Sequence, residues 1–443
     1  MRDQRQLLWC SIDNDSSLDL DQLTVADPLP NGSVKILVAI ADVDAVVKDG
    51  TPIDRHARIN TTSVYTAAKI FPMLPERLST DLTSLNEGED RIAMVFEMTV
   101  LPDGTVSESD VYRSWVRNYA KLAYRSVAAW LDGHAAMPEK VQHVKGMEEQ
   151  LRIQDRVAGA MKAVRYQHGA LDLETIEPQT VVSDGRIVDL KVETKNRAQV
   201  MIEDFMIAAN GICASFLIKR GWPVIQRLVR TPDRWDRIRD VARELGESLP
   251  AIPDSKALAE FLARRRQADP IRFADLSLAI VKLMGRGEYM VQHPGEASSG
   301  HFGLAVRQYS HSTAPNRRYP DLITQRLLKA ALADKPKPYS ESELSELATH
   351  CTMQEDAAQK VERQVRKSAA SQFLATRIGE RFEAIVTGAS NKGTWVRTLK
   401  TPAEGRLISG FDRVQVGQQI SVRLTSVNVE KGFIDFALTG NER

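Results

Sequence analysis

Cysteine is scarce in this chain of 443 residues, and its three copies, Cys10, Cys213 and Cys351, lie far apart in the sequence. None of them forms a CxxC pair, which excludes a disulfide framework and a zinc site built on paired thiolates. We therefore expect three buried thiols in a reducing compartment, and a cytoplasmic protein.

Export signals and long apolar runs are also missing. The N-terminus reads MRDQRQ and has no apolar signal core, and no apolar run looks long enough to span a bilayer, so we expect no membrane partner. The net charge of +1 argues against a protein that coats nucleic acid with a uniformly basic surface, but it is compatible with a nuclease that has a basic channel. The length favours two or three domains, and 43% hydrophobic residues can form a large core.

Acidic residues, by contrast, crowd near the N-terminus. Asp13, Asp15, Asp19 and Asp21 stand within nine residues, a segment that we call the acidic loop (residues 13–21). Carboxylates this close repel one another, and a hard divalent cation relieves the repulsion; Mg²⁺ is the natural ion, with Mn²⁺ as the alternative. Side chains two apart leave the same face of an extended segment, and the turn formers at 14–17 allow Asp13 to fold back. A solvated turn or a weak Ca²⁺ loop is the alternative interpretation of this stretch alone.

A second polar segment, residues 309–322, carries adjacent arginines at Arg317 and Arg318 between two prolines. We call it the arginine loop. Guanidinium donors match phosphate oxygens bidentately, so the loop suits phosphate binding. A surface loop paired with local acids is the simpler alternative.

Strand-like patterns precede helical ones, which indicates an α+β domain. The predicted strands cover residues 34–40 and 93–100, followed by a turn at Pro102-Asp103-Gly104. Helical periodicity covers 144–164, 199–219 and 233–245, and a capping box at Ser340–Glu343 predicts a long helix toward Ile378.

Five short strand-like runs follow Gly379, at residues 382–387, 394–399, 404–408, 419–429 and 433–438. Five such strands suit a small barrel of the OB type, which commonly binds single-stranded nucleic acid. Four aromatics here could stack on bases, namely Trp395, Phe411, Phe433 and Phe436; we expect at most one or two of them to contact RNA, because most aromatics in so small a barrel are core.

The acidic loop and the arginine loop together resemble the catalytic domain of the ribonuclease II family, also called the RNB family. Further segments that resemble the family, in the family's order, are 38–43, 62–65, 71–79, 84–91, 120–124, 201–206 and 301–305. The resemblance implies an RNB-type catalytic domain over 1–376 and an OB-fold RNA-binding barrel over 379–440. Family members commonly carry cold-shock-type domains before the catalytic domain, and we expect these to be absent because the acidic loop begins at residue 13.

The resemblance also implies an activity, namely 3′-to-5′ hydrolysis of single-stranded RNA to nucleoside 5′-monophosphates with the help of Mg²⁺. Separately, we expect a monomer. Asp13, Asp19 and Asp21 match the family's metal-binding aspartates, and Asp21 matches the one most directly involved in catalysis. Arg317 matches an arginine that grips the scissile phosphate. The family's fourth aspartate corresponds to Gln22, which offers one carbonyl oxygen without a charge. Asp15 is either a compensating ligand or a turn residue.

Other matched positions concern RNA binding. Tyr65 matches an aromatic that stacks on terminal bases, and the alternative is a core tyrosine. Tyr124 and Glu203 match positions that read the ribose 2′-hydroxyl, and the alternative is a buried tyrosine and an exposed glutamate in helices. Glu362 matches a glutamate near the active site, with a solvated helix position as the alternative, and we add Arg318 as a phosphate contact. The family's second stacking aromatic belongs near residues 177–182, which contain none.

Two rival functions are possible, and incubation with 5′-labelled single-stranded RNA and Mg²⁺ would distinguish them from an exoribonuclease. The first is an RNA-binding protein with an RNB fold and weakened hydrolysis, which Gln22 and the missing aromatic favour and the retained aspartates oppose. The second is a phosphodiesterase for DNA or small nucleotides, which no sequence feature recommends. His301 and His311 lie near the arginine loop without metal-ligand spacing, so we expect structural or hydrogen-bonding roles for them.

Overall fold

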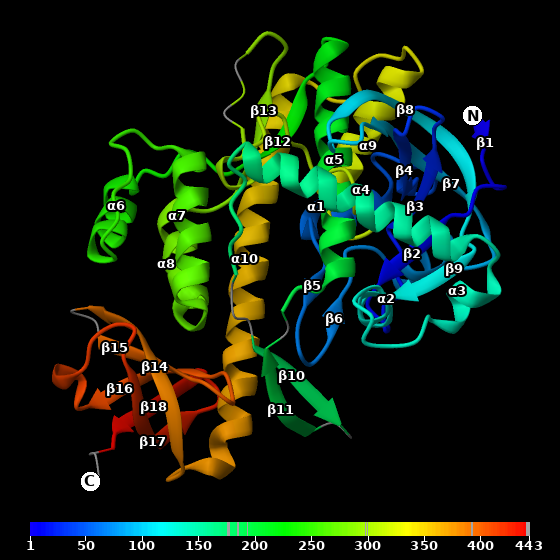
Figure 1. Ribbon diagram of the computed structural model, residues 1–443. Helices are drawn as coiled ribbons and strands as arrows, with labels where there is room; N and C mark the ends of the chain where they lie inside the picture. Colours follow the sequence, from blue (N-terminus) through cyan, green and yellow to red (C-terminus); the bar gives the residue numbers. More distant parts are fainter. Residues whose placement is uncertain are drawn as a thin grey trace.

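Figure 1 shows the computed structural model of the chain. The structure describes residues 1–439 apart from 175–177, 184–185, 193, 297, 299 and 391–392. A seven-stranded sheet, a helical region and a closed β-barrel follow one another along the chain, and a long helix connects the sheet region with the barrel. The architecture is therefore α+β with a C-terminal barrel, as the sequence predicts.

The seven-stranded sheet forms the core of the N-terminal part, in the order β1-β8-β7-β4-β3-β2-β9. Its strands are β1 (Arg2–Asp3), β2 (Cys10–Asp13), β3 (Gln22–Pro28), β4 (Val34–Ala41), β7 (Asp90–Val100), β8 (Val106–Arg117) and β9 (Ala120–Ala123). The strands predicted at 34–40 and 93–100 correspond to β4 and β7. Strand β4 lies at the centre of the sheet and is apolar along most of its length because both of its faces are covered.

The predicted turn between β7 and β8 is present and is fixed by a close approach. Gly104 has φ +90°, and a Cβ atom there would lie 2.3 Å from the carbonyl oxygen of Ala160. Glycine is required at this point because a side chain would collide with the backbone of α4. The turn thus holds the β7–β8 hairpin against α4.

Helices pack on the sheet and also build a separate helical region. The helices are α1 (Pro52–Asn60), α2 (Tyr124–Leu131), α3 (Glu139–His143), α4 (Met147–Gln167), α5 (Arg197–Lys219), α6 (Trp235–Glu244), α7 (Ser255–Ala268), α8 (Pro270–Met284), α9 (Tyr319–Leu332) and α10 (Glu341–Leu374). The short helical turns are η1 (Val43–Ala45), η2 (Arg77–Leu82), η3 (Phe302–Leu304), η4 (Ala375–Arg377) and η5 (Phe411–Arg413). Helices α4, α5 and α6 match the three predicted helical segments. Helices α6 to α8 pack on a hydrophobic cluster of their own around Trp235 and Phe261.

Helix α5 crosses the sheet and contacts β2, β4, β7 and β8. Among the described residues it is the one helix long and apolar enough to cross a membrane by length and composition, which contradicts our expectation that no apolar run reaches that length. In the structure, 61% of its most apolar window is buried inside the fold. A helix packed on a sheet explains the apolar sequence.

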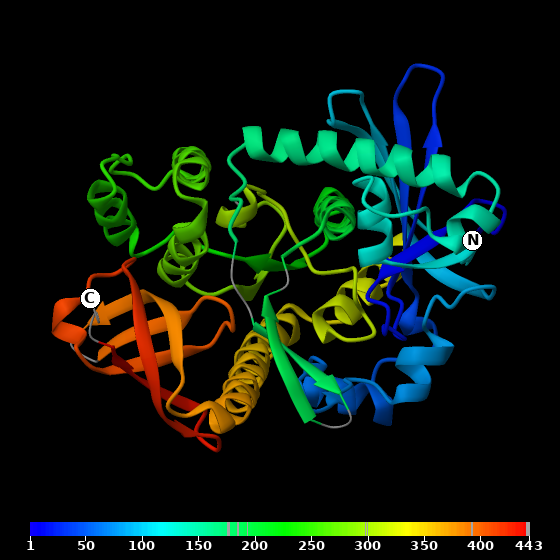
Figure 2. The same cartoon turned by 60° about the horizontal axis from the view of Figure 1, so that its bottom comes forward.

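Helix α10 extends from the sheet region to the barrel and carries two hairpins on its side (Figures 1 and 2). The Ser340 hydroxyl oxygen accepts a hydrogen bond from the Glu343 backbone N–H, which begins the helix at the predicted cap. The hairpins are β5 (Val64–Tyr65) with β6 (Ile70–Phe71), and β10 (Pro178–Ser183) with β11 (Arg186–Val192); a third pair is β12 (Val224–Leu228) with β13 (Glu288–Gln292). Strands β5 and β10 both contact α10, so segments far apart in the sequence meet along this helix.

The barrel closes in the order β14-β15-β16-β18-β17, with β16 and β18 parallel. Its strands are β14 (Arg381–Ser390), β15 (Gly393–Thr398), β16 (Glu404–Ser409), β17 (Gln419–Asn428) and β18 (Phe433–Leu438). Ala370 and Leu374 of α10 and Leu190 of β11 join the barrel's hydrophobic core. The bidentate ion pair between Arg397 and Asp275 adds a link to α8. The predicted small barrel is confirmed; residue 440, the predicted end of that domain, lies outside the described residues.

Candidate active site

The acidic loop folds back on itself at the end of β2. The Ser17 backbone N–H donates to the Asn14 carbonyl oxygen at 3.0 Å, which forms the predicted turn. Asp13 accepts hydrogen bonds from the Asn14 N–H at 2.7 Å and the Ser17 hydroxyl at 2.9 Å. Burial nevertheless raises the pKa of Asp13 above its ordinary value. Asp15 lies exposed in the turn, as a turn residue would.

The pair of Asp21 and Arg317 is the centre of the site. The Arg317 Nε–H donates to Asp21 Oδ2 at 2.7 Å, and the Asp21 side chain is 3% exposed while that of Arg317 is 42% exposed. The second carboxylate oxygen of Asp21, Oδ1, is buried and has no hydrogen-bond partner. Burial raises the pKa of Asp21 to about 6, and nearby Asp19 adds to the rise although Arg317 opposes it. A desolvated, half-satisfied carboxylate beside a second carboxylate attracts a cation.

Backbone pairing between two distant segments places Arg317 there. The Ser63 N–H donates to the Arg317 carbonyl oxygen at 2.9 Å, and the Tyr319 N–H donates to the Thr61 carbonyl oxygen at 2.7 Å. Thr62 and Arg318 form an antiparallel bridge between these bonds. The segment before β5 therefore aligns with the arginine loop at the start of α9.

This alignment also positions Tyr65, which connects three parts of the site. Its hydroxyl donates to Asp19 Oδ2 at 3.2 Å, and its backbone N–H donates to Glu362 Oε1 of α10 at 2.8 Å. Tyr65 as a residue stays 40% exposed, which contradicts the alternative of a core tyrosine and leaves surface for stacking. Burial of the hydroxyl, together with Asp19 and Asp21, raises the pKa of Tyr65, so the phenol remains a hydrogen-bond donor.

Arg318 occupies a different environment from its neighbour. Its guanidinium binds Asp321 bidentately at 2.9 and 2.6 Å, and the Ala314 N–H donates to the same carboxylate at 2.8 Å. Asp321 is fully buried, and we infer that the pair holds the loop in shape. The sequence signal was an acid three residues after the arginine, at the N-terminus of a helix.

Tyr124 and Glu203 stand at the edge of the site. Tyr124 begins α2, and its pKa is raised by burial and by the charges of Asp13, Asp21 and Glu203, which places it within their electrostatic reach. Glu203, on α5, binds Lys195 through both carboxylate oxygens at 2.7 and 2.9 Å. Sequence reasoning did not anticipate this lysine.

Gln22 points into the sheet. It begins β3, is 7% exposed, and its Nε2 donates to the Ile12 carbonyl oxygen of β2 at 3.3 Å. The amide therefore has a structural partner. Within the described part of the chain, no group of three or more His, Cys, Asp or Glu side chains stands at metal-binding spacing. The donor set nevertheless suits a hard cation, because the unpartnered Oδ1 of Asp21 and the carboxylates of Asp13 and Asp19 are oxygen ligands.

His301, which precedes the arginine loop, and His311, which lies within it, have structural hydrogen-bond partners. His311 Nδ1 and the Tyr289 hydroxyl are hydrogen-bonded at 2.8 Å, and His301 Nδ1 accepts from the Leu304 N–H at 3.1 Å. Burial lowers the pKa of His301 to about 4 and that of His311 far below its ordinary range. Both rings are neutral at physiological pH, as packing residues would be.

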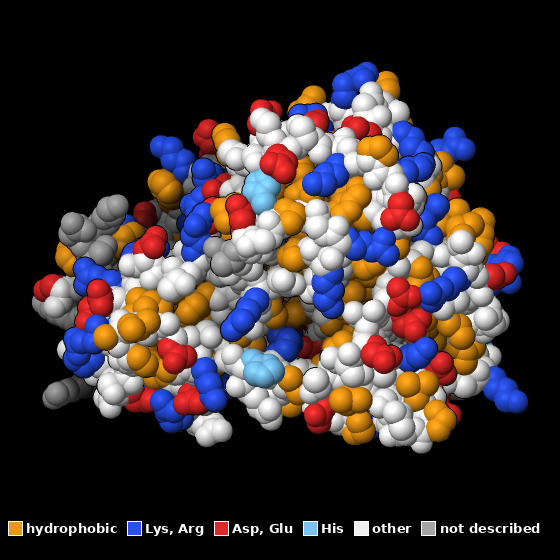
Figure 3. Space-filling model, turned by 90° about the horizontal axis from the view of Figure 1, so that it is seen from above, with side chains coloured by type: hydrophobic (Ala, Val, Ile, Leu, Met, Phe, Trp, Pro, Cys, Tyr) orange, Lys and Arg blue, Asp and Glu red, His pale blue; other side chains and the backbone are white. Residues whose placement is uncertain are grey.

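A pocket of about 690 Å³ opens beside Asp19. Its walls come from the acidic loop, the β5–β6 segment with Tyr65, the turn around Glu76, and two residues from elsewhere, Thr180 of β10 and Arg366 of α10. Glu177, in the stretch where the family's second aromatic belongs, lies outside the described residues. On the face shown in Figure 3, basic and acidic side chains are interspersed around a central hollow with basic side chains in it.

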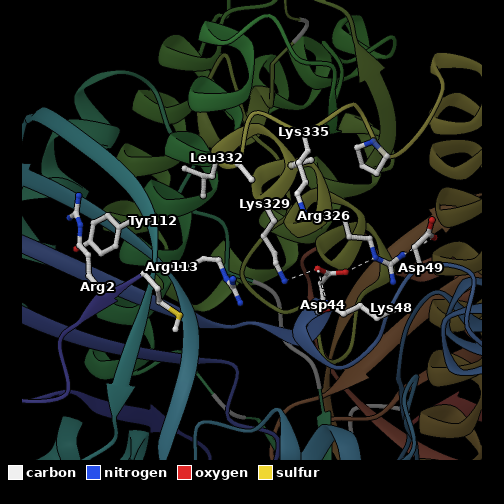
Figure 4. Close-up of a pocket in the computed structure, with 14 residues that line it drawn as sticks. Arg2, Asp44, Lys48, Asp49, Tyr112, Arg113, Arg326, Lys329, Leu332 and Lys335 are labelled. Atoms are coloured by element: carbon white, nitrogen blue, oxygen red, sulfur yellow. Dashed lines mark hydrogen bonds and ion pairs between the residues drawn. The ribbon is translucent and has the colours of Figure 1, made fainter.

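A larger cavity of about 820 Å³ surrounds the C-terminal half of α9 (Figure 4). Half of the lysines and arginines in its described lining are paired with buried acids, since Arg113 and Lys329 each contact Asp42 at 2.7 Å and Arg326 binds Asp54 at 2.7 Å. Its described lining includes no residue of the acidic loop or the arginine loop. We assign this cavity to the ion-pair network that holds α9 and not to a catalytic role.

Family comparison agrees with this geometry. The family model described as "RNB domain" matches residues 1–334. The chain belongs to the RNB family. A second model, "RNase II-type exonuclease C-terminal S1 domain", matches residues 380–439 and covers the barrel.

Similar proteins carry the name ribonuclease R. That of Escherichia coli K12 is 30% identical over 482 residues, covering 100% of this chain and 58% of the relative; ribonuclease R 1 of Lactococcus lactis is 28% identical over 471 residues, covering 99% and 56%. The chain thus spans slightly more than half the length of these curated relatives.

Solved structures support the fold. Mycoplasma genitalium RNase R in complex with ribose-methylated single-stranded RNA matches with a TM-score of 0.88 at 22% identity, over 99% of this chain and 72% of that one. Yeast Ssd1, described as a pseudonuclease, matches with a TM-score of 0.73 at 17% identity, over 92% of this chain and 50% of that one. Because both a ribonuclease and a pseudonuclease share the fold, the site residues must decide the activity.

Proposed function

We propose that this chain is a 3′-to-5′ exoribonuclease that hydrolyses single-stranded RNA to nucleoside 5′-monophosphates. The observation that carries the proposal is the Asp21–Arg317 pair, in which a buried carboxylate keeps one oxygen unpartnered beside a half-exposed guanidinium. Buried carboxylates with an unsatisfied oxygen and a raised pKa are concentrated at functional sites, and this one lies beside a guanidinium that solvent can reach. The names of the relatives support the same activity.

The proposed active site also includes a divalent cation, Mg²⁺ or Mn²⁺. Asp21 through Oδ1, with Asp13 and Asp19, would hold it, and Gln22 contributes less because its amide is bonded to β2. When bound, such an ion activates water and neutralises charge on the transferring phosphoryl group. The net reaction breaks the P–O3′ bond, adds water, and leaves the phosphate on the 5′ oxygen of the released nucleotide.

The remaining site residues have roles that follow from their contacts. Arg317 remains reachable from solvent and binds the scissile phosphate, while Asp21 fixes its orientation. Tyr65 stacks on the terminal base, and Glu362 positions it by accepting its backbone N–H. Tyr124 and Glu203 recognise the ribose 2′-hydroxyl, a role supported by the electrostatic coupling of Tyr124 to Asp13, Asp21 and Glu203. Arg318 shapes the arginine loop more than it binds phosphate.

The direct test uses 5′-labelled single-stranded RNA with Mg²⁺, and the same sequence as DNA. We expect stepwise shortening from the 3′ end and release of 5′-monophosphates from RNA alone. Arg317→Ala should lose turnover, whereas Arg363→Ala, an exposed arginine on α10, should not. RNA that is bound but never shortened would favour the RNA-binding alternative, and degraded DNA would favour the phosphodiesterase.

We also propose a cytoplasmic location and a monomeric state. The three cysteines are free and buried, which supports a reducing compartment. Sedimentation of the purified protein tests the monomer, and a tagged copy followed in cells tests the location.

A further inference from the structure

The pocket beside Asp19 has one aromatic wall and one wall that has no assigned role. Tyr65 and the β5–β6 segment form the first wall. The second includes Thr180 from β10 and Arg366 from α10, which lie far from the acidic loop in sequence. Thr180 is too small to stack on a base, and residues 177–182 contain no aromatic side chain.

Helix α10 carries Arg366 one turn beyond the point where the helix contacts Tyr65. Glu362 accepts the Tyr65 backbone N–H at 2.8 Å, which fixes α10 against β5. Arg366 follows Glu362 by four residues, one helical turn, so both side chains leave the same face of α10. Arg366 is half-buried, and the long helix gives it a rigid base.

A guanidinium group can replace an aromatic ring in this position. It is planar, stacks on nucleobases, and attracts their π-faces electrostatically without reading their sequence. Resting on the proposed function, we propose that Arg366 forms the second face of the subsite for the 3′-terminal base, opposite the Tyr65 ring. The terminal base is then held between an aromatic face and a cationic plane, in place of two aromatic rings.

A binding experiment with two RNAs distinguishes a base contact from a phosphate contact. Binding is measured with the Asp21→Asn protein in the presence of Mg²⁺, using single-stranded RNA with a normal 3′ nucleotide and the same RNA with an abasic 3′ ribose. Adding Arg366→Ala should weaken binding of the normal RNA roughly 5- to 30-fold and leave binding of the abasic RNA nearly unchanged. Arg366→Lys should resemble Arg366→Ala, since it keeps the charge and loses the plane.

Two further variants complete the test. Arg363→Ala, an exposed arginine of the same helix, is the matched control and should change neither affinity. Thr180→Phe in the Arg366→Ala background should restore part of the lost affinity for normal RNA, because it supplies a stacking ring from the same wall. An equal loss on both RNAs would show a phosphate contact and overturn the proposal, as would no loss on either.

Failure of the underlying function has a different signature. If the unmodified protein binds RNA but does not shorten it, the exoribonuclease proposal fails whatever the Arg366 variants do. If it shortens RNA and Arg366→Ala behaves like the control on both substrates, only the role of Arg366 is rejected.

Discussion

Asp21→Asn should stabilise this protein while it abolishes turnover. Burial raises the pKa of Asp21 to about 6 from an ordinary value of 3.8, which means that the fold disfavours the ionised form. Stability from this group is fully present below pH 3.8 and is lost as pH rises through about 6. At neutral pH the ionised carboxylate is a cost that the asparagine side chain does not carry.

The size of the effect follows from the pKa. A difference of about two pKa units corresponds to roughly 3 kcal/mol, because each unit is about 1.4 kcal/mol. The side chain is 3% exposed, so solvent screens little of this. For a domain of this size, roughly 3 kcal/mol raises the melting temperature by a few degrees. In the variant Arg317 loses its charged partner, and this loss reduces the gain in stability. The reduction is small because the guanidinium remains partly solvated.

Denaturant unfolding in EDTA at pH 8 and pH 5 measures the prediction. Asp21→Asn should exceed the parent in unfolding free energy at pH 8, and the advantage should shrink at pH 5, where the parent carboxyl is mostly protonated. Asp15→Asn, an exposed carboxylate of the same loop, is the control and should change stability at neither pH. Added Mg²⁺ should stabilise the parent and not Asp21→Asn. A variant that is less stable at both pH values would refute the reasoning, and undiminished turnover would refute the role of Asp21.

Three further outcomes are expected. Gln22→Asp should lower the Mg²⁺ concentration needed for turnover; a less active enzyme with an unchanged Mg²⁺ curve would show that the amide belongs to the sheet. Phe433→Ala, which removes a 61% exposed ring from β18, should weaken binding of long RNA several-fold without changing cleavage of very short RNA, whereas Phe436→Ala should unfold the barrel because that ring is fully buried; equal far-ultraviolet circular dichroism of the two variants would contradict this. Tyr65→Ala should raise KM for RNA roughly 5- to 50-fold, and Tyr65→Phe, which loses only the bond to Asp19, should change it far less; equal effects would rule out stacking.

Local patterns predicted the elements well for identifiable reasons. Apolar continuity marked β4, helical periodicity marked α4 and α5, and the Ser340 cap marked the start of α10, because each signal depends on neighbouring residues. We underestimated from the sequence how long and apolar the α5 segment is. Its composition does not show whether such a helix lies in a membrane or in a protein core, and its packing on the sheet shows that it is a core helix. Likewise, the strands of the barrel were evident, but closure decided that Phe436 is core and Phe433 exposed.

The amino-acid pattern was sufficient to predict the family and the acidic loop, since Asp13, Asp19 and Asp21 lie close together in sequence and the turn between them is a local feature. The groups that complete the site come from distant segments, so they became evident only in the folded chain. The bond from Tyr65 to Glu362 spans 297 positions, and that from Asp21 to Arg317 spans 296. Such contacts depend on how the hairpins and α10 pack around the sheet, and packing is a property of the whole chain, because many distant pairs have compatible chemistry and one arrangement buries the apolar surface best.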